Sequence, residues 1–334
     1  MPVACGTLIG SMRARLTVTP RQYRWIAWSA LGVLTLIVFT GAAVRLTGSG
    51  LGCPTWPKCT GTSYVAPLES HQGIEFGNRL LTSVVGLPCF LALVGGWFRK
   101  PYRRDFMLLG LALCLSVLAQ AVLGGITVLT GLNPYTVMGH YMVSMGALAL
   151  AAVLVWRVER ERARAPQSVA RDRRLVLAVR GLFAYGLLMI LVGTAASAAG
   201  PHGGGDGTGD EVARLDFKGA DTLDWLITGH ARMAAVYGVL AVVGYLAIWR
   251  RRRDRDLLLP LGTVCVLLGL QGIVGNVQYH ADPALPAAIV WVHVALAALT
   301  FNALMWLLLA TGRSAATVPP GVEAPEQERA AASV

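Results

Sequence analysis

Three polar side chains share one face of a predicted helix, where a polar loop runs into an apolar segment. Read as a helix, His71, Glu75 and Asn78 lie at i, i+4 and i+7. Arg79 follows, and residues 80–97 are nearly all apolar. An acid, an imidazole and a guanidinium are costly at the mouth of a membrane helix, so this group indicates a functional site. The alternative is a set of interfacial side chains that anchors a helix end.

The composition is that of an integral membrane protein. Of 334 residues, 55% are hydrophobic and 14% are charged, and the mean hydropathy is +0.57. Soluble proteins carry about a quarter charged residues, so this chain is expected to lie in a lipid bilayer. Eight segments have about the roughly twenty residues that a membrane helix needs, namely 24–44, 76–97, 106–129, 136–156, 175–197, 223–249, 257–278 and 287–311.

The positive charges follow the topology of these segments. The formal net charge of +11 comes largely from arginines in the amino-terminal tail and in every second loop, at 99–104, 157–174 and 250–255. Short cytoplasmic loops carry such an excess. We therefore expect a multi-pass protein of the cell membrane with both termini cytoplasmic, and we do not expect nucleic-acid binding.

The two halves of the chain resemble each other. Residues 41–48 (GAAVRLTG) match residues 193–200 (GTAASAAG) at an offset of 152 residues. Ordered matches at a constant spacing indicate an internal repeat. Further matches keep nearly the same offset: Gln120 with Gln271, Gly124 with Gly275, and His140 with His293.

The predicted fold is an all-α integral membrane protein with eight transmembrane helices, arranged as two pseudo-repeated four-helix bundles. Residues 24–156 form the first bundle and residues 175–311 the second, both in the same orientation. Residues 157–174 form a cytoplasmic linker between them. Residues 1–23 are a cytoplasmic tail, and residues 312–334, rich in Ala, Pro and Glu, are expected to be a disordered cytoplasmic tail.

The repeat aligns two polar positions of the first half with two histidines of the second. It places Asn78 opposite His230, and His140 opposite His293, and each lies within about two turns of the outward end of its helix. Two histidines at matched depth on neighbouring helices of a bundle are suited to hold a haem iron axially. The alternative is that each histidine is a hydrogen-bonded packing residue.

The loop after the first helix contains two cysteines, Cys53 and Cys59, on the outward and oxidising side. Six residues apart in one loop, they most simply form a disulfide that stiffens it. Metal binding is a weaker alternative, because no second cysteine pair accompanies them. A catalytic dithiol has no specific support from the sequence.

Four further motifs stand out in the sequence: VRLTGSGLGCPTWPKC (44–59), IEFGNR (74–79), GGITVLTGLNPYTVMGH (124–140) and GPHGGGD (200–206). These motifs resemble the haem A synthase family, and together with the histidines they cover essentially all eight segments. The resemblance implies an eight-helix enzyme that oxidises a ring methyl group of haem O to the formyl group of haem A, with a bound haem b in the second half.

Carried over by position, the resemblance makes His230 and His293 the axial ligands of haem b. It makes His140 the histidine that faces the substrate haem, and Cys53 and Cys59 the family's first-loop disulfide. Histidine is thus the expected iron ligand at three positions.

Glu75 matches the family's essential acid, and its partner in the repeat is the apolar Ile227. The acid therefore belongs to the predicted substrate half alone. Near a haem, a carboxylate could relay protons or stabilise positive charge as the methyl carbon is oxidised. The alternative is an ion pair with Arg79, four residues further along the helix.

The chain departs from the family at Asn78, where many members have histidine. Asn is a poor ligand for haem iron. His71 is on the same face and could approach the substrate site instead, although it would lie about 10 Å away along the helix axis. No cysteine pair occurs in loop 198–222.

Two arginines are candidates to bind haem propionates, because arginine pairs with carboxylates in a bidentate manner. We expect Arg79, toward the substrate haem, or Arg232, toward the cofactor, to make such a contact. His202 and His280 lie in outward loops and are expected first to be surface residues, with a role at the substrate mouth as the alternative.

The rival functions are a membrane cytochrome b that only binds haem and transfers electrons, and a transporter with inverted repeats. The unrepeated Glu75 favours the enzyme, and the common orientation of the halves argues against the transporter. The enzyme would need haem O and an electron donor that the sequence does not identify. Haem O synthase is a further candidate partner.

Overall fold

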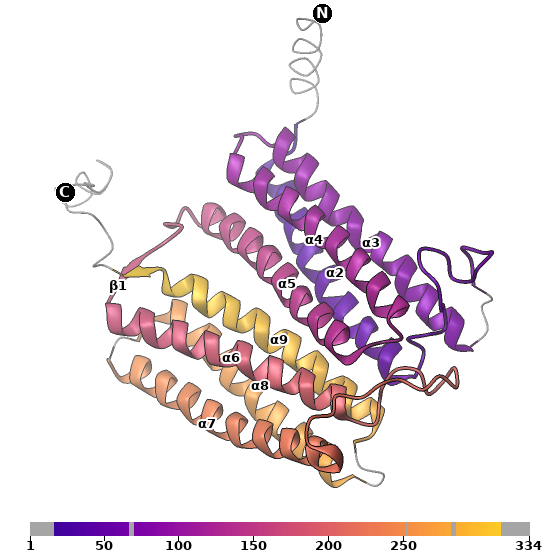
Figure 1. Ribbon diagram of the computed structural model, residues 1–334. Coiled ribbons are helices and arrows are strands. Elements are labelled where there is room, and N and C mark those ends of the chain that lie inside the picture. Colours follow the sequence, from indigo (N-terminus) through magenta and orange to yellow (C-terminus); the bar gives the residue numbers. More distant parts are fainter. Residues whose placement is uncertain (1–16, 67–69, 252, 282–284, 315–334) are drawn as a thin grey trace, which may run out of the picture.

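The computed structural model describes residues 17–66, 70–251, 253–281 and 285–314, and these are mostly helix (Figure 1). Eight helices are long and apolar enough to cross a membrane, which confirms the predicted all-α, multi-pass membrane fold. They are α2 (Pro20–Leu46), α3 (Ser70–Phe98), α4 (Arg104–Leu129), α5 (Pro134–Arg162), α6 (Arg173–Ala199), α7 (Thr222–Arg251), α8 (Arg255–His280) and α9 (Ala287–Thr311).

Each predicted segment lies inside one of these helices, and all but the last are longer than predicted. Most of the extra residues are polar or charged ones that the apolar pattern could not include. Several helices begin at a cap that the sequence encodes. Thr19 and Gln22 form a capping box with Pro20 as the first helical residue of α2. The side chains of Asn133 and Asp172 accept backbone N–H groups at the starts of α5 and α6.

The helices pack in the same order in both halves of the chain. In the first half α2 contacts α3 and α5, and α4 contacts α3 and α5. In the second half α6 contacts α7 and α9, and α8 contacts α7 and α9. The halves meet where α9 packs against α2 and α5, and where α5 packs against α6 (Figure 1). A repeat would produce this order, although the repeat itself stays a prediction.

The interface between the halves is part of the protein core. Ala298, Phe301 and Met305 of α9 belong to the same buried cluster as residues of α2 and α5. The cluster therefore joins the halves by apolar burial, and we expect them to behave as one unit. The segment after α5 adds a small link, because strand β1 (Ala170–Arg171) pairs in parallel with β2 (Arg313–Ser314).

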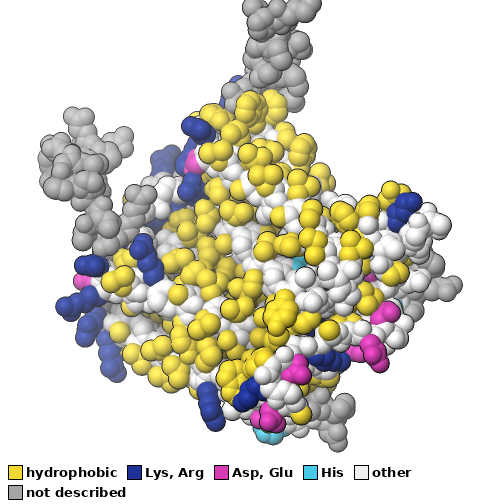
Figure 2. All heavy atoms as spheres, viewed as in Figure 1, with side chains coloured by type: hydrophobic (Ala, Val, Ile, Leu, Met, Phe, Trp, Pro, Cys, Tyr) yellow, Lys and Arg dark blue, Asp and Glu magenta, His cyan; other side chains and the backbone are white. Residues whose placement is uncertain are grey.

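Ion pairs between helices stabilise the basic end of the molecule. Figure 2 shows Lys and Arg side chains gathered along one edge, beside broad hydrophobic faces. Arg24 of α2 pairs with Glu159 of α5 at 2.5 Å, and the buried Arg99 pairs with Glu161 at 2.6 Å. These charges therefore cross-link helices, in addition to the orientation that the sequence predicts from them.

The predicted disorder concerns residues 312–334, of which residues 315–334 lie outside the described residues.

Candidate active site

His230 on α7 and His293 on α9 face each other in the second half. Their ring centres are 6.2 Å apart and their planes meet at 65°. If an imidazole nitrogen binds iron at about the 2 Å seen for other first-row metals, two axial rings stand about 6 Å apart, centre to centre. The spacing therefore suits one iron between the two rings.

The surroundings of these two rings also suit an added group. The Nδ1 atom of each is buried without a hydrogen-bond partner among the described residues. Each ring packs on a glycine of a neighbouring helix, so that a Cβ on Gly193 would lie 3.1 Å from His230 Cε1, and one on Gly275 would lie 3.5 Å from His293 Cε1. Buried polar atoms normally have partners. The pair thus fits a haem held between two imidazoles.

In the first half, His140 of α5 and Asn78 of α3 have different surroundings. His140 packs near Gly124 of α4, at 3.6 Å from a Cβ placed there, and its Nδ1 is also buried without a described partner. Gln120 donates to the carbonyl oxygen of His140 at 3.3 Å. Asn78 Oδ1 accepts a hydrogen bond from Thr40 Oγ1 of α2 at 2.8 Å. This half therefore offers one imidazole where the other offers two.

Glu75 is buried, with 5% of its surface exposed, and its carboxylate has partners on both oxygens. Oε1 accepts from Arg79 Nη2 at 2.6 Å and from Arg79 Nε at 3.1 Å. Oε2 accepts from the backbone N–H of Cys53 at 2.6 Å. The ion pair considered from the sequence is present, and it is part of a contact with the first outward loop. A direct catalytic role of Glu75 stays a prediction.

Arg79 uses its whole guanidinium in this contact. Besides Glu75, Nη1 donates to the carbonyl oxygens of Thr55 at 2.9 Å and Lys58 at 3.3 Å, and Nη2 donates to that of Cys53 at 2.7 Å. Guanidinium has five N–H donors, and Arg79 makes five bonds. The contact between Arg79 and a propionate stays a prediction, and in this arrangement all five N–H groups already have other acceptors.

The loop that Arg79 holds is closed by the predicted disulfide, which is confirmed, with an S–S distance of 1.98 Å between Cys53 and Cys59. Inside the closed loop, Trp56 packs on the backbone of α4. A Cβ on Gly125 would lie 2.6 Å from its indole ring, whereas the adjacent Gly124 faces His140. The disulfide loop therefore reaches α4 beside the histidine of the first half.

His71 lies between the two large outward loops. Its Nδ1 is 2.8 Å from Ser49 Oγ, and Gly207 of the second-half loop packs directly on its ring. The N–H of Gly207 also donates to the carbonyl oxygen of Gly48 at 3.1 Å. A role for His71 at the substrate iron stays a prediction, while its described partners are in the loops.

Arg45 and His202 complete this contact between the loops. Arg45 donates to the carbonyl oxygens of His202 at 3.0 Å and Ser197 at 2.9 Å. His202 is half-buried, and its Nε2 lies 2.8 Å from the carbonyl oxygen of Leu285. His202 is therefore a partly exposed residue that also bridges two loops, whereas His280 is exposed as expected.

Arg232 follows His230 on α7 and is exposed. No hydrogen bond or ion pair joins it to the described residues, so its guanidinium is available to an anionic group. Its contact with a propionate of the cofactor stays a prediction.

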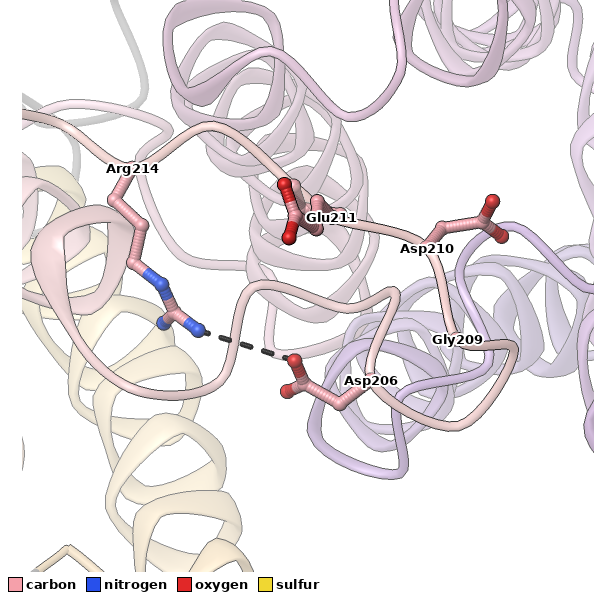
Figure 3. A pocket seen from close by; sticks show the side chains of 6 residues that line it. Asp206, Gly209, Asp210, Glu211 and Arg214 are labelled. Carbon is pink, nitrogen blue, oxygen red and sulfur yellow. Dashed lines mark ion pairs between the residues drawn. The ribbon is translucent and has the colours of Figure 1, made fainter.

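A shallow pocket of about 470 Å³ lies in the loop after α6, away from the predicted site residues in sequence. In Figure 3, Asp206 points toward Arg214, at 3.9 Å, while Asp210 and Glu211 extend elsewhere. Within the described ranges no group of three or more His, Cys, Asp or Glu side chains is arranged to hold a metal ion. The acids of this pocket therefore do not form a metal site.

Comparison with known proteins places the chain in a family. The family described as cytochrome oxidase assembly protein (COX15-CtaA) matches residues 24–73 and 68–201. These residues run from α2 to the start of the second-half loop and include the disulfide loop, Glu75 and His140. The chain belongs to this family. The match confirms the family that the motifs indicated.

Curated relatives bear the name Heme A synthase. That of Lysinibacillus sphaericus is 32% identical over 145 residues, which are 42% of this chain and 47% of the relative. That of Listeria welshimeri is 30% identical over 141 residues, 40% and 46% of the two chains. That of Geobacillus thermodenitrificans is 31% identical over 156 residues, 45% and 48%. The chain thus spans about half the length of the curated relatives it matches.

Proposed function

We propose that this protein is a haem A synthase, an oxidoreductase that converts the ring methyl group of haem O to the formyl group of haem A. The observation that carries the proposal is the difference between the halves. The second half holds two imidazoles 6.2 Å apart, whereas the first half has one imidazole, that of His140, together with Asn78 and the buried acid Glu75. The name of the curated relatives supports the same activity.

The second half would hold the cofactor, a haem b, through His230 and His293. When bound, haem supplies one-electron redox chemistry. The glycines behind the rings let each imidazole approach a neighbouring helix closely and so limit its rotation. Arg232, exposed and without a described partner, would pair with a propionate of this haem.

The first half would bind the substrate. His140 would bind the iron of haem O and so orient the substrate. The disulfide loop, held by Arg79 and Glu75, lies over the outward end of α3 and contacts α4 through Trp56. Placed there, the loop excludes water from the substrate, and the Glu75 carboxylate provides negative charge near the carbon that becomes oxidised.

The electron-transfer cytochrome is the less favoured reading. A protein that only passed electrons between two haems would be served by paired ligands in both halves. Here the repeat equivalent of Glu75 is Ile227, and that of His230 is Asn78. Both differences fall in the half assigned to the substrate.

The reaction needs partners that the chain does not supply. Haem O is the substrate, and haem O synthase would deliver it. Oxidation of the substrate methyl group also requires an electron-transfer partner, which remains unidentified. Arginines at the ends of α2 and α5 support a place in the cell membrane with both termini cytoplasmic.

The proposal is tested in cells that make haem O but no haem A. Expression of this chain should produce a formyl-bearing haem that is detected by chromatography and mass spectrometry of extracted haems. Accumulation of haem O with no formyl product, in membranes that contain the folded protein, would rule the enzyme out.

A further inference from the structure

Two glycines at matching positions of the two halves have different surroundings. Gly193 of α6 lies against the ring of His230, which fills the space beside it. Gly41 of α2 is its partner in the sequence repeat, and an added Cβ there would meet no atom within 4 Å. The space that an imidazole fills in the second half is therefore open in the first.

The side chain of Asn78 is held by a hydrogen bond from the residue next to Gly41. Its Oδ1 accepts the hydrogen bond of Thr40, the residue next to Gly41, at 2.8 Å. This bond leaves the two N–H donors of the amide, which have no partner among the described residues. The side chain of Asn78 is half-buried, so a small molecule can reach these donors.

We propose that Asn78 and Gly41 form a binding pocket for one small ligand, on the face of the substrate haem opposite His140. The ligand class is a small oxygen- or nitrogen-containing molecule, such as water, dioxygen or a small anion, that binds iron and accepts a hydrogen bond from the Asn78 amide. The inference rests on the proposed function, because it takes haem O to be bound by His140.

The chemistry of the side chains supports this assignment. An amide is a poor ligand for haem iron, so Asn78 leaves the sixth coordination position free. An amide N–H near that position stabilises a bound ligand that carries negative charge, as distal donors do in haem proteins. A histidine here would close the same position, as His230 does in the second half.

The test is ligand binding to the purified ferric protein loaded with haem O, followed by absorption and electron paramagnetic resonance spectra. The second-half haem, with both axial positions taken, serves as an internal reference. The wild type should contain one high-spin haem that binds cyanide and imidazole at one equivalent per chain. Asn78→His should make this haem low-spin and prevent binding of both ligands.

Two further variants test the pocket without relying on Asn78→His. Asn78→Leu is nearly isosteric and cannot donate a hydrogen bond, so cyanide affinity should fall about five- to tenfold while imidazole still binds. Gly41→Val should fill the space and exclude imidazole. Gly32→Val is the matched control, because Gly32 is on the same helix and also has no atom within 4 Å of an added Cβ.

The outcomes separate this inference from the proposed function. A wild-type protein that binds and converts haem O, yet is low-spin and does not bind cyanide, overturns the pocket alone. Equal cyanide affinity in the wild type and Asn78→Leu overturns the role of the amide. If haem O does not bind at all, the proposed function and the pocket are both wrong.

Discussion

Replacement of Arg79 by lysine should release the disulfide loop from α3. Arg79 makes three hydrogen bonds to loop carbonyl oxygens and two to Glu75. Lysine has three donors on one nitrogen, so it can keep the ion pair with Glu75 but cannot span the carbonyls of Cys53, Thr55 and Lys58 together. The loop would then keep the bond from Cys53 N–H to Glu75 and its own disulfide.

The size of the effect follows from the bonds that are lost. Hydrogen bonds to charged groups contribute about 1.5–3 kcal/mol each. The side chain of Arg79 is 22% exposed, so solvent screening reduces this contribution to about 1 kcal/mol for each of the two or three lost bonds. Local opening of the loop should therefore become easier by about 2–3 kcal/mol. Its open population would rise roughly 30- to 150-fold.

Hydrogen exchange measured by mass spectrometry reports this opening directly. Peptides that contain Cys53 and Cys59 should exchange faster in Arg79→Lys by about that factor. Arg24→Lys is the matched control, because Arg24 forms a comparable ion pair at the opposite end of the molecule, 29% exposed. Unchanged exchange of the loop in Arg79→Lys would refute the view that this guanidinium holds it.

Three further substitutions test the haem sites. His293→Ala should remove the low-spin haem b signal from the absorption spectrum, and an unchanged signal would exclude His293 as a ligand. Gly193→Val should also weaken that signal, because the added Cβ lies 3.1 Å from the ring of His230; full retention of haem b would show that this packing is unimportant. Gly125→Ala should displace Trp56, whose ring lies 2.6 Å from the added Cβ, and raise the KM for haem O more than it lowers kcat. An unaltered KM would show that the indole does not border the substrate.

The fold could be predicted from sequence because its main signals are local. Long apolar runs fix eight helices in a bilayer whatever their neighbours are, and caps such as Thr19 and Asn133 mark where helices start. The spacing of Glu75 and Arg79 on one helix likewise predicts their ion pair. Each of these depends on residues a few positions apart.

The parts that could not be predicted depend on backbone groups far along the chain. The carbonyl oxygens that Arg79 binds belong to loop residues of any type, so no pattern of side chains marks them. The sequence around His202 predicts a surface residue, because no neighbouring residue indicates that the distant carbonyl oxygen of Leu285 is its hydrogen-bond partner. The paired glycines Gly124 and Gly125 were a usable signal, since such a pair permits close approach of the bulky side chains of His140 and Trp56.

The most direct test of the account compares haems extracted from membranes that contain the wild type and the variants His140→Ala and His293→Ala, in cells that make haem O. The account predicts a formyl-bearing haem with the wild type and none with either variant, with haem b retained by His140→Ala and lost from His293→Ala. Formation of haem A by the folded His140→Ala variant at the wild-type level would contradict it, because substrate oxidation would then not depend on the first-half histidine.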